Sequence, residues 1–140
     1  MDRIRVLLVE QYPLLADITC EILLKDPCIA VVGEAKGIEE ATRLAARRRP
    51  DVALIDISAG ESKGLALARE LARTRPGMSV ILLGEEASND YAEAAQQAGA
   101  SYLPRPQVVA DLLPTLHRQR PDCCSDLTEL VTPFKGRVGL

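Results

Sequence analysis

The chain has 140 residues, a formal net charge of −3 and 47% apolar side chains. This length favours one domain, with a core large enough to fold without disulfides or metal ions. No apolar run approaches the roughly 18 residues of a membrane span. Strand-like sequence follows the first few residues at once, so we expect a cytoplasmic protein with neither a membrane segment nor a signal peptide.

Positive charge is concentrated in one short run, Arg47-Arg48-Arg49, at the end of a predicted helix. Cations are favourable at that position because the helix dipole is negative there. We therefore expect no direct binding of nucleic acid, although the run leaves that possibility open.

Four cysteines and one histidine provide few metal ligands. No two cysteines have C-x-x-C spacing, and one histidine does not complete a convincing zinc site. Cys20 and Cys28 lie on or beside apolar segments and are interpreted as small buried side chains in a reducing compartment. The roles of Cys123 and Cys124, which lie in a polar segment, stay open.

Along the chain, apolar strand-like segments alternate with helical segments five times. The predicted strands cover residues 4–9, 29–32, 51–56, 80–83 and 101–103. The predicted helices run from Pro13 to near Asp26, over 38–48, through the stripe of Leu65, Ala68, Leu71 and Ala72, over 88–98 and over 108–116. Such short alternation predicts a parallel sheet with helices on both faces.

The last predicted helix is weak, because Pro114 lies inside it and periodicity fades after it. We expect residues 1–117 to form the domain. Residues 118–140 are expected to form a flexible or loosely packed tail, which is too short for a second domain.

Polar residues at the predicted strand ends are the candidates for chemistry, because ligands of an open α/β sheet bind at the carboxyl ends of its strands. Glu10 follows the first strand, Asp56 ends the third and Arg105 follows the fifth. Two neighbouring carboxylates need a cation or a proton, and Mg²⁺ is one solution. Neutralisation of charge by a cation also serves phosphoryl transfer. An Asp56 that only caps a turn is an equally good interpretation.

Five landmarks resemble the receiver family of bacterial two-component response regulators. They are Ile4-Arg5-Val6-Leu7-Leu8-Val9-Glu10-Gln11, Pro50-Asp51-Val52-Ala53-Leu54-Ile55-Asp56, Val80 to Gly84, Ala98-Gly99-Ala100 and Tyr102-Leu103-Pro104-Arg105-Pro106. The resemblance implies a flavodoxin-like fold with five parallel strands in the order 2-1-3-4-5. It also implies a signalling domain, not an enzyme, that accepts a phosphoryl group on Asp56 from a histidine kinase or a phosphotransfer protein.

By this resemblance, Glu10, Gln11, Asp56 and the backbone carbonyl of Ser58 would hold Mg²⁺. Gln11 stands where the family has a second acidic residue, so its amide brings no charge. We therefore expect Mg²⁺ binding that is weak or absent.

Three further positions of the resemblance concern switching. Gly84 stands where the family has a Thr or Ser whose hydroxyl binds the phosphoryl group, and Arg105 replaces the family lysine. Tyr102 matches the aromatic residue that swings inward on activation. Beside Gly84, Tyr102 would either stay inward permanently or be an ordinary half-buried strand residue.

Two functions follow for this atypical receiver. The principal expectation is a domain switched by phosphorylation, and the alternative is a pseudo-receiver that binds proteins without it. In both we expect a downstream protein partner on the face of Tyr91, Tyr102 and Val109, and a homodimer stays possible. An unrelated α/β enzyme or nucleotide binder is disfavoured, because the sequence contains neither G-x-G-x-x-G, nor G-x-x-x-x-G-K-[ST], nor a nucleophile elbow.

Overall fold

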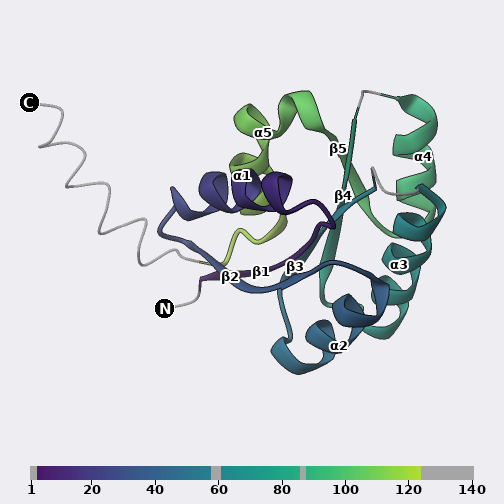
Figure 1. Cartoon of the computed structure of the whole chain (residues 1–140), viewed down its shortest axis with the longest axis horizontal. Coiled ribbons are helices and arrows are strands. Elements are labelled where there is room, and N and C mark those ends of the chain that lie inside the picture. Colours follow the sequence, from purple (N-terminus) through teal and green to yellow (C-terminus); the bar gives the residue numbers. More distant parts are fainter. Residues whose placement is uncertain (1–2, 58–60, 86–87, 124–140) are drawn as a thin grey trace, which may run out of the picture.

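Within residues 3–57, 61–85 and 88–123, which the computed structural model describes, five strands alternate with five α-helices. The strands are β1 Ile4–Val9, β2 Ile29–Ala35, β3 Val52–Asp56, β4 Ser79–Gly84 and β5 Ser101–Pro104. The helices are α1 Pro13–Leu24, α2 Ile38–Arg48, α3 Glu61–Thr74, α4 Asn89–Gln97 and α5 Val108–Gln119, with a short 3₁₀ turn, η1, at Arg105–Gln107. The strands form one parallel sheet in the order β2-β1-β3-β4-β5, which confirms the predicted flavodoxin-like arrangement (Figure 1).

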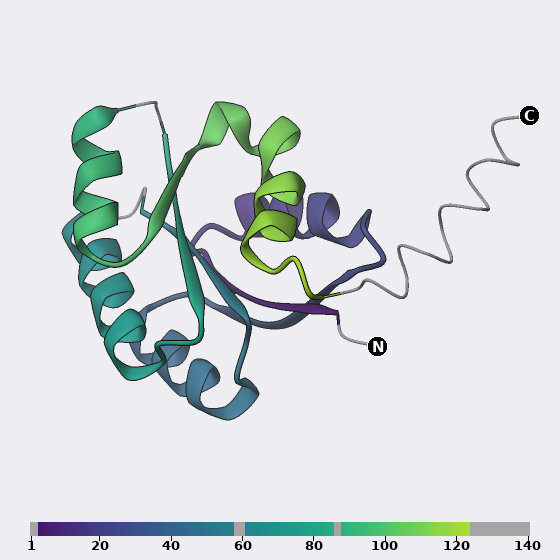
Figure 2. The same ribbon diagram turned by 180° about the vertical axis from the view of Figure 1, so that it is seen from behind.

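Helices cover both faces of the sheet (Figures 1 and 2). α1 and α5 lie side by side on one face, where Leu23, Leu112 and Leu116 are fully buried. α2, α3 and α4 cover the other face, where Ala41 and Ala95 of the core are completely buried. In the part of the chain that the structure describes, no helix combines the length and the apolar character needed to cross a membrane.

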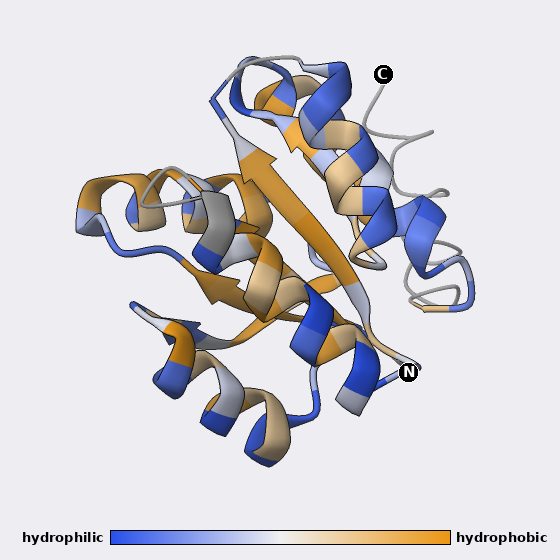
Figure 3. Ribbon diagram, turned by 90° about the vertical axis from the view of Figure 1, so that its right-hand side faces the viewer, coloured by the Kyte–Doolittle hydropathy of each residue, from blue (hydrophilic) through white to orange (hydrophobic). Residues whose placement is uncertain are grey.

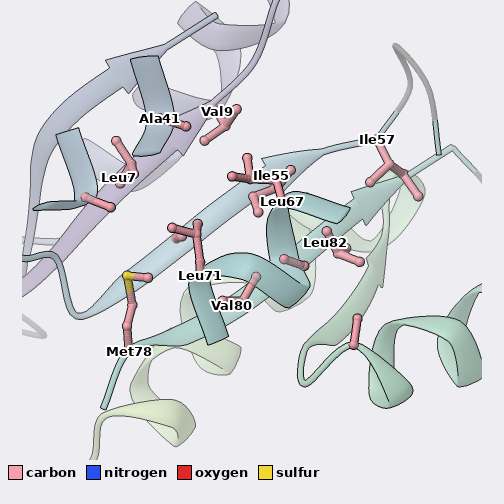
Figure 4. Packing of buried hydrophobic residues seen from close by; sticks show 14 of the residues in the cluster. Leu7, Val9, Ala41, Ile55, Ile57, Leu67, Leu71, Met78, Val80 and Leu82 are labelled. Atoms are coloured by element: carbon pink, nitrogen blue, oxygen red, sulfur yellow. The ribbon is translucent and has the colours of Figure 1, made fainter. Parts of the chain in front are cut away.

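The central strand β3 is buried along its whole length and carries side chains into both cores. Ile55 packs with Val9, Leu67 and other members of the α2–α3–α4 core (Figure 4), while Leu54 belongs to the core under α1 and α5. Each fully buried aliphatic side chain contributes about 1.5–3 kcal/mol. This burial fixes the position of Asp56, the last residue of the strand.

β2 extends to Ala35, beyond the predicted end at residue 32. Gly33 and Glu34 pair with Leu7 and Leu8 of β1, after a register shift that follows Val6. Glycine and glutamate have low strand propensity, but both are tolerated here because β2 is an edge strand whose outer side is unpaired. Pairing with the apolar β1 overrides the local propensity.

Helix α5 ends at Gln119, so the predicted end at residue 116 is wrong. The helix continues past the exposed Pro114 because Val108, Leu112 and Leu116 bury one stripe of it. Arg118, predicted as the first tail residue, is therefore helical. The next residue after the helix, Arg120, donates from Nη2 to the carbonyl oxygens of Asp51, at 2.8 Å, and Gly77. Residues 124–140 of the predicted tail lie outside the described residues.

Candidate functional site

Four strand ends bring the predicted site residues to the carboxyl edge of the sheet. Glu10 follows β1, Asp56 ends β3, Gly84 ends β4 and Arg105 begins the turn after β5. Because the strands are parallel and paired in register, with Asp56 opposite Leu83 of β4, their ends meet at one edge. The residues that sequence reasoning selected from strand ends are thus neighbours in the structure.

A buried ion pair joins Arg105 to the two carboxylates. Nη2 of Arg105 pairs directly with Oδ2 of Asp56 and lies 3.7 Å from Oε1 of Glu10. The side chains of Asp56 and Glu10 are only 1% and 2% exposed, against 26% for Arg105. Leaving two buried carboxylates without a cation costs several kcal/mol, so the guanidinium group is the counterion that makes this arrangement stable.

Two prolines restrict the backbone around Arg105. Pro104, which is buried, precedes it and Pro106 follows it, and η1 starts at Arg105 itself. Each proline fixes its own φ near −65°, and Pro104 has φ of −66°. Arg105 therefore leaves the end of β5 in a direction that its two neighbours restrict.

Burial raises the pKa of Glu10 above its ordinary value of 4.5. The backbone N–H of Tyr12, which donates to Oε2 of Glu10 at 3.2 Å, and the charge of Arg105 both oppose this shift. The folded state thus binds this proton more tightly than the unfolded state. The stability that protonated Glu10 contributes is present at low pH and is lost as the pH rises above 4.5 through the raised pKa.

Of the four predicted Mg²⁺ ligands, the two carboxylates already face a cation of the protein itself. Mg²⁺ requires oxygen ligands at about 2.0–2.1 Å in octahedral geometry. Of the predicted set, Glu10 and Asp56 already face the guanidinium group of Arg105, and Gln11 is exposed. The fourth predicted ligand, Ser58, lies outside the described residues. The guanidinium group of Arg105 therefore lies where a metal ion would have to approach both carboxylates.

A Mg²⁺ titration tests this interpretation. We expect the wild-type protein to bind Mg²⁺ weakly, and the combined change Arg105→Ala and Gln11→Asp to bind it at least about tenfold more tightly, because one cation is removed and one carboxylate added. Calorimetry or NMR shifts on titration with Mg²⁺ measure the difference. Gln11→Asp with Arg105 retained should gain less. Equal affinity of the wild type and the double variant would show that Arg105 does not compete with the metal.

A cavity of about 310 Å³ opens beside Asp56, between α2 and α3. Asp56 and Gln11 line its polar side, and Val9, Ile55 and Leu67 line its apolar side. Figure 4 shows these three apolar side chains at the top of the α2–α3 core. Asp56 lines this cavity, although its side chain is almost completely buried.

Tyr102 occupies the space that a side chain at position 84 would need. Its Cα pairs with Leu82 of β4, and its ring reaches along the sheet over Gly84. A Cβ atom added to Gly84 would overlap the Tyr102 hydroxyl and lie 2.6 Å from Cζ of the ring. Tyr102 is half-buried and packs against the α3–α4 side of the core, so the ring is inward.

Tyr102 also contacts Tyr91 of α4, which belongs to the same predicted partner surface. Its ring lies 5.9 Å from that of Tyr91, at an interplanar angle of 48°. Such tilted pairs contribute about 0.5–1.5 kcal/mol beyond their burial. Val109, at the start of α5, is 79% exposed. We name the surface of Tyr91, Tyr102 and Val109, on α4, β5 and α5, the output surface.

A second polar cluster lies at the opposite end of the molecule. His117 Nε2 and Asp26 Oδ2 are 2.7 Å apart, and Cys28 lies beside them. Cys28 is buried, as expected from the sequence, but it is disulfide-bonded, so its sulfur is not available to a metal ion. Cys20 instead packs, half-buried, against the α1–α5 core, and burial is the main cause that raises its pKa to about 11.

Residues 6–123 match the family model of the response regulator receiver domain. The chain belongs to this family. Among curated relatives, the transcriptional regulatory protein PdtaR of Mycobacterium tuberculosis is 32% identical over 113 residues, which are 80% of this chain and 54% of that protein. A protein-glutamate methylesterase/protein-glutamine glutaminase of Methanospirillum hungatei is 38% identical over 81 residues, 58% of this chain and 23% of that protein.

Solved structures support the same assignment. The response regulator domain of Thermotoga maritima CheB has a TM-score of 0.73 and 26% identity, and the match covers 84% of this chain and 96% of that one. A LuxR-family response regulator from Aurantimonas has a TM-score of 0.78 at 21% identity, covering 95% and 98%. The chain spans only 54% of the length of PdtaR and 23% of the length of the methylesterase/glutaminase. Receiver domains are signalling modules that commonly bind Mg²⁺ and interact with histidine kinases or phosphotransfer proteins.

Sequence reasoning found the pocket residues but missed how they interact. It treated Arg105 as a substitute for the family lysine and did not predict the ion pair with Asp56. The prolines on both sides of Arg105 were a signal that its direction is restricted. The apolar side of the cavity left no signal, because Val9, Ile55 and Leu67 are ordinary core positions in the sequence.

Proposed function

We propose that this receiver presents its output surface in one state and does not need phosphorylation to do so. The observation that carries the proposal is the position of Tyr102, whose ring lies inward over Gly84 in the unmodified protein. By the family resemblance, an inward aromatic at this position belongs to the activated form. A downstream protein that binds the output surface would therefore recognise the unmodified protein.

The energetics of switching support the proposal. Phosphorylation shifts a population only if the phosphoryl group interacts differently with the two states. The family's differential contacts come from a hydroxyl on the fourth strand and from a lysine. Gly84 offers no hydroxyl, and Arg105 is already paired with Asp56 without a phosphoryl group. Few contacts therefore remain that would differ between the unmodified and the phosphorylated protein and so move Tyr102.

NMR on the unmodified protein, without Mg²⁺ and without a phosphodonor, tests the proposal. We expect nuclear Overhauser contacts between the ring protons of Tyr102 and the α protons of Gly84, because the ring lies directly over that residue. Tyr91→Ala, which removes the neighbouring ring, is a control that should weaken but not abolish these contacts. If they appear only after phosphodonor treatment, the inward position requires phosphorylation and the proposal is wrong.

Phosphoryl acceptance on Asp56 is the second candidate function, and the cavity beside Asp56 favours it. A histidine kinase or phosphotransfer protein would deliver the group from that side, where Asp56 lines a space of about 310 Å³. Arg105 would then neutralise charge on the transferred group. Intact mass after treatment with a small phosphodonor measures the modification. Asp56→Asn is the control, and an added phosphoryl mass in that variant too would place the modification elsewhere.

The partner of the output surface is proposed to be a downstream protein, in a cytoplasmic signalling pathway. The surface combines an exposed valine with a pair of tyrosines in contact, and tyrosine is enriched where proteins meet. A second copy of the chain would use the same surface in a homodimer. Measurement of the mass in solution, for the wild type and for Val109→Asp, distinguishes the two.

A further inference from the structure

At the amino end of the sheet, opposite to Asp56, five arginines from distant parts of the chain come together. They are Arg5 on β1, Arg48 and Arg49 at the end of α2, Arg75 before β4 and Arg120 after α5, and we name this set the arginine edge. Helices run antiparallel to the strands they cover, so the helix ends that carry these residues meet where the strands begin. Figure 3 colours the segment that leaves α2 as hydrophilic.

Hydrogen bonds place the five residues next to one another. Arg5 Nη2 donates to the carbonyl of Arg48, and Arg75 Nη1 donates at 3.4 Å to the carbonyl of Ala45, which also accepts the backbone N–H of Arg49. Arg120 Nη2 donates to the carbonyl of Asp51, whose carboxylate accepts the backbone N–H of Arg5 at 2.9 Å. The five segments are therefore tied into one continuous surface.

The arginine edge has no ion pair within the part of the chain that the structure describes. Among the described residues, none of its five guanidinium groups forms an ion pair with a carboxylate, whereas Arg73 and Arg105 both do. In that same part of the chain, Nε of Arg120 is buried without a hydrogen-bond partner. Arg5, Arg48 and Arg49 are exposed. The five arginines outnumber the Asp51 carboxylate that lies within their hydrogen-bond network, so the edge keeps a net positive charge and attracts a ligand with several negative charges.

We propose that the arginine edge binds the phosphate backbone of a nucleic acid duplex. The guanidinium group is planar and presents a fork of donors that matches phosphate oxygens. The described aromatic side chains, Tyr12, Tyr91 and Tyr102, lie on segments at other parts of the surface, so contact is made to phosphates without base stacking and is independent of base sequence.

A membrane surface is a poorer partner for the same charges. Stable membrane binding combines cations with apolar side chains that enter the lipid. Of the exposed large apolar residues in the described ranges, only Leu24, at the end of α1, comes from a segment that ends at this side of the sheet. From the sequence we expected no direct binding of nucleic acid. The run of residues 47–49 was apparent there, but the distant arginines that lie beside it in the fold were not.

Fluorescence anisotropy with a short labelled DNA duplex of arbitrary sequence tests the proposal on the full chain. We expect binding that weakens roughly 40- to 150-fold between about 50 and about 200 mM salt, which corresponds to three or four neutralised phosphates. A duplex of different sequence should bind within about twofold. Absence of binding at the lower salt concentration would overturn the proposal.

Matched neutral variants locate the site. Arg48→Gln with Arg49→Asn removes two charges from the arginine edge, and asparagine suits the left-handed backbone of residue 49, whose φ is 49°. Lys36→Gln with Lys63→Gln removes the same charge from the opposite edge. We expect the first pair to lower affinity at least about tenfold and to reduce the salt slope by about 1.8, and the second to change affinity less than about twofold. Equal losses would refute a localised site.

Two competitors decide the chemistry of the ligand. Polyglutamate carries carboxylates, and vesicles with anionic phospholipid carry phosphate on a surface. We expect the unlabelled duplex to displace the probe at a much lower concentration of negative charge than either competitor does. Equal displacement by polyglutamate or by the vesicles would overturn the assignment to nucleic acid. The melting temperatures of the variants should stay within a few degrees of that of the wild type. Unfolding then does not explain a loss of binding.

Discussion

Gly84→Thr is expected to expel the Tyr102 ring from its inward position and to destabilise the protein by about 1–3 kcal/mol, the usual cost of overpacking. The reason is steric, because any Cβ at position 84 overlaps the Tyr102 hydroxyl. Displacement of the Tyr102 ring should also separate this ring from that of Tyr91 and alter the output surface. Urea denaturation measures the stability, and the chemical shifts of the tyrosine rings report their displacement.

A double-mutant cycle isolates the cause of this effect. If the clash with Tyr102 is responsible, Gly84→Thr in a Tyr102→Ala background should cost at least about 1 kcal/mol less than in the wild type. Gly77→Ala is the matched control, since nothing lies within 4 Å of a Cβ at that position. Equal costs of Gly84→Thr in both backgrounds would show that the ring is not what excludes a side chain from position 84.

Arg105→Ala is expected to cost about 3 kcal/mol of folding stability at neutral pH. This value is at the lower end of the range for removing one partner of a buried ion pair, because 26% of the Arg105 side chain is exposed. The variant leaves Asp56 and Glu10 close together without a cation. Arg105→Lys keeps the charge and should recover most of the loss. Arg43→Ala, at an exposed site on α2, should change stability by less than about 0.5 kcal/mol.

The cost of Arg105→Ala should depend on pH in a defined direction. The charge of Arg105 lowers the pKa of Glu10 against the larger effect of burial, so its removal raises that pKa further. A raised carboxyl pKa destabilises the folded state increasingly as the pH rises above 4.5. The difference between wild type and variant should therefore grow from acidic to neutral pH. A difference that is constant with pH would show that the loss is one of packing and not of charge.

Periodicity and strand ends were sufficient to predict the framework of the site. The bounds of β1 and α2 agree with the prediction to the residue, because apolar runs and amphipathic stripes record burial directly. Parallel pairing then carries Glu10, Asp56 and Arg105 to one edge without further information. Local sequence was misleading where tertiary contacts dominate, as in the last turn of α5 and the glycine-containing end of β2.

Distances between side chains from different strands could not be predicted. The sequence shows that position 105 is cationic, but not that its guanidinium group pairs with Asp56 in preference to solvent. It shows a glycine and a tyrosine at positions 84 and 102, but the fit of one ring over one missing side chain depends on the β4–β5 register. The arginine edge could not be predicted either, because its members are up to 115 positions apart in the chain and come together only in the fold.

Amide chemical shifts of the wild-type receiver, measured with and without a phosphoryl mimic at Asp56, test whether the output surface needs phosphorylation. We expect the shifts to stay near Glu10, Asp56 and Arg105, because Tyr102 is already inward. In Gly84→Thr, where a hydroxyl is restored and the ring displaced, the shifts should spread over residues 88–115. Large shifts across residues 88–115 in the wild type would show that phosphorylation still changes the output surface, and the proposal of a single state would then be wrong.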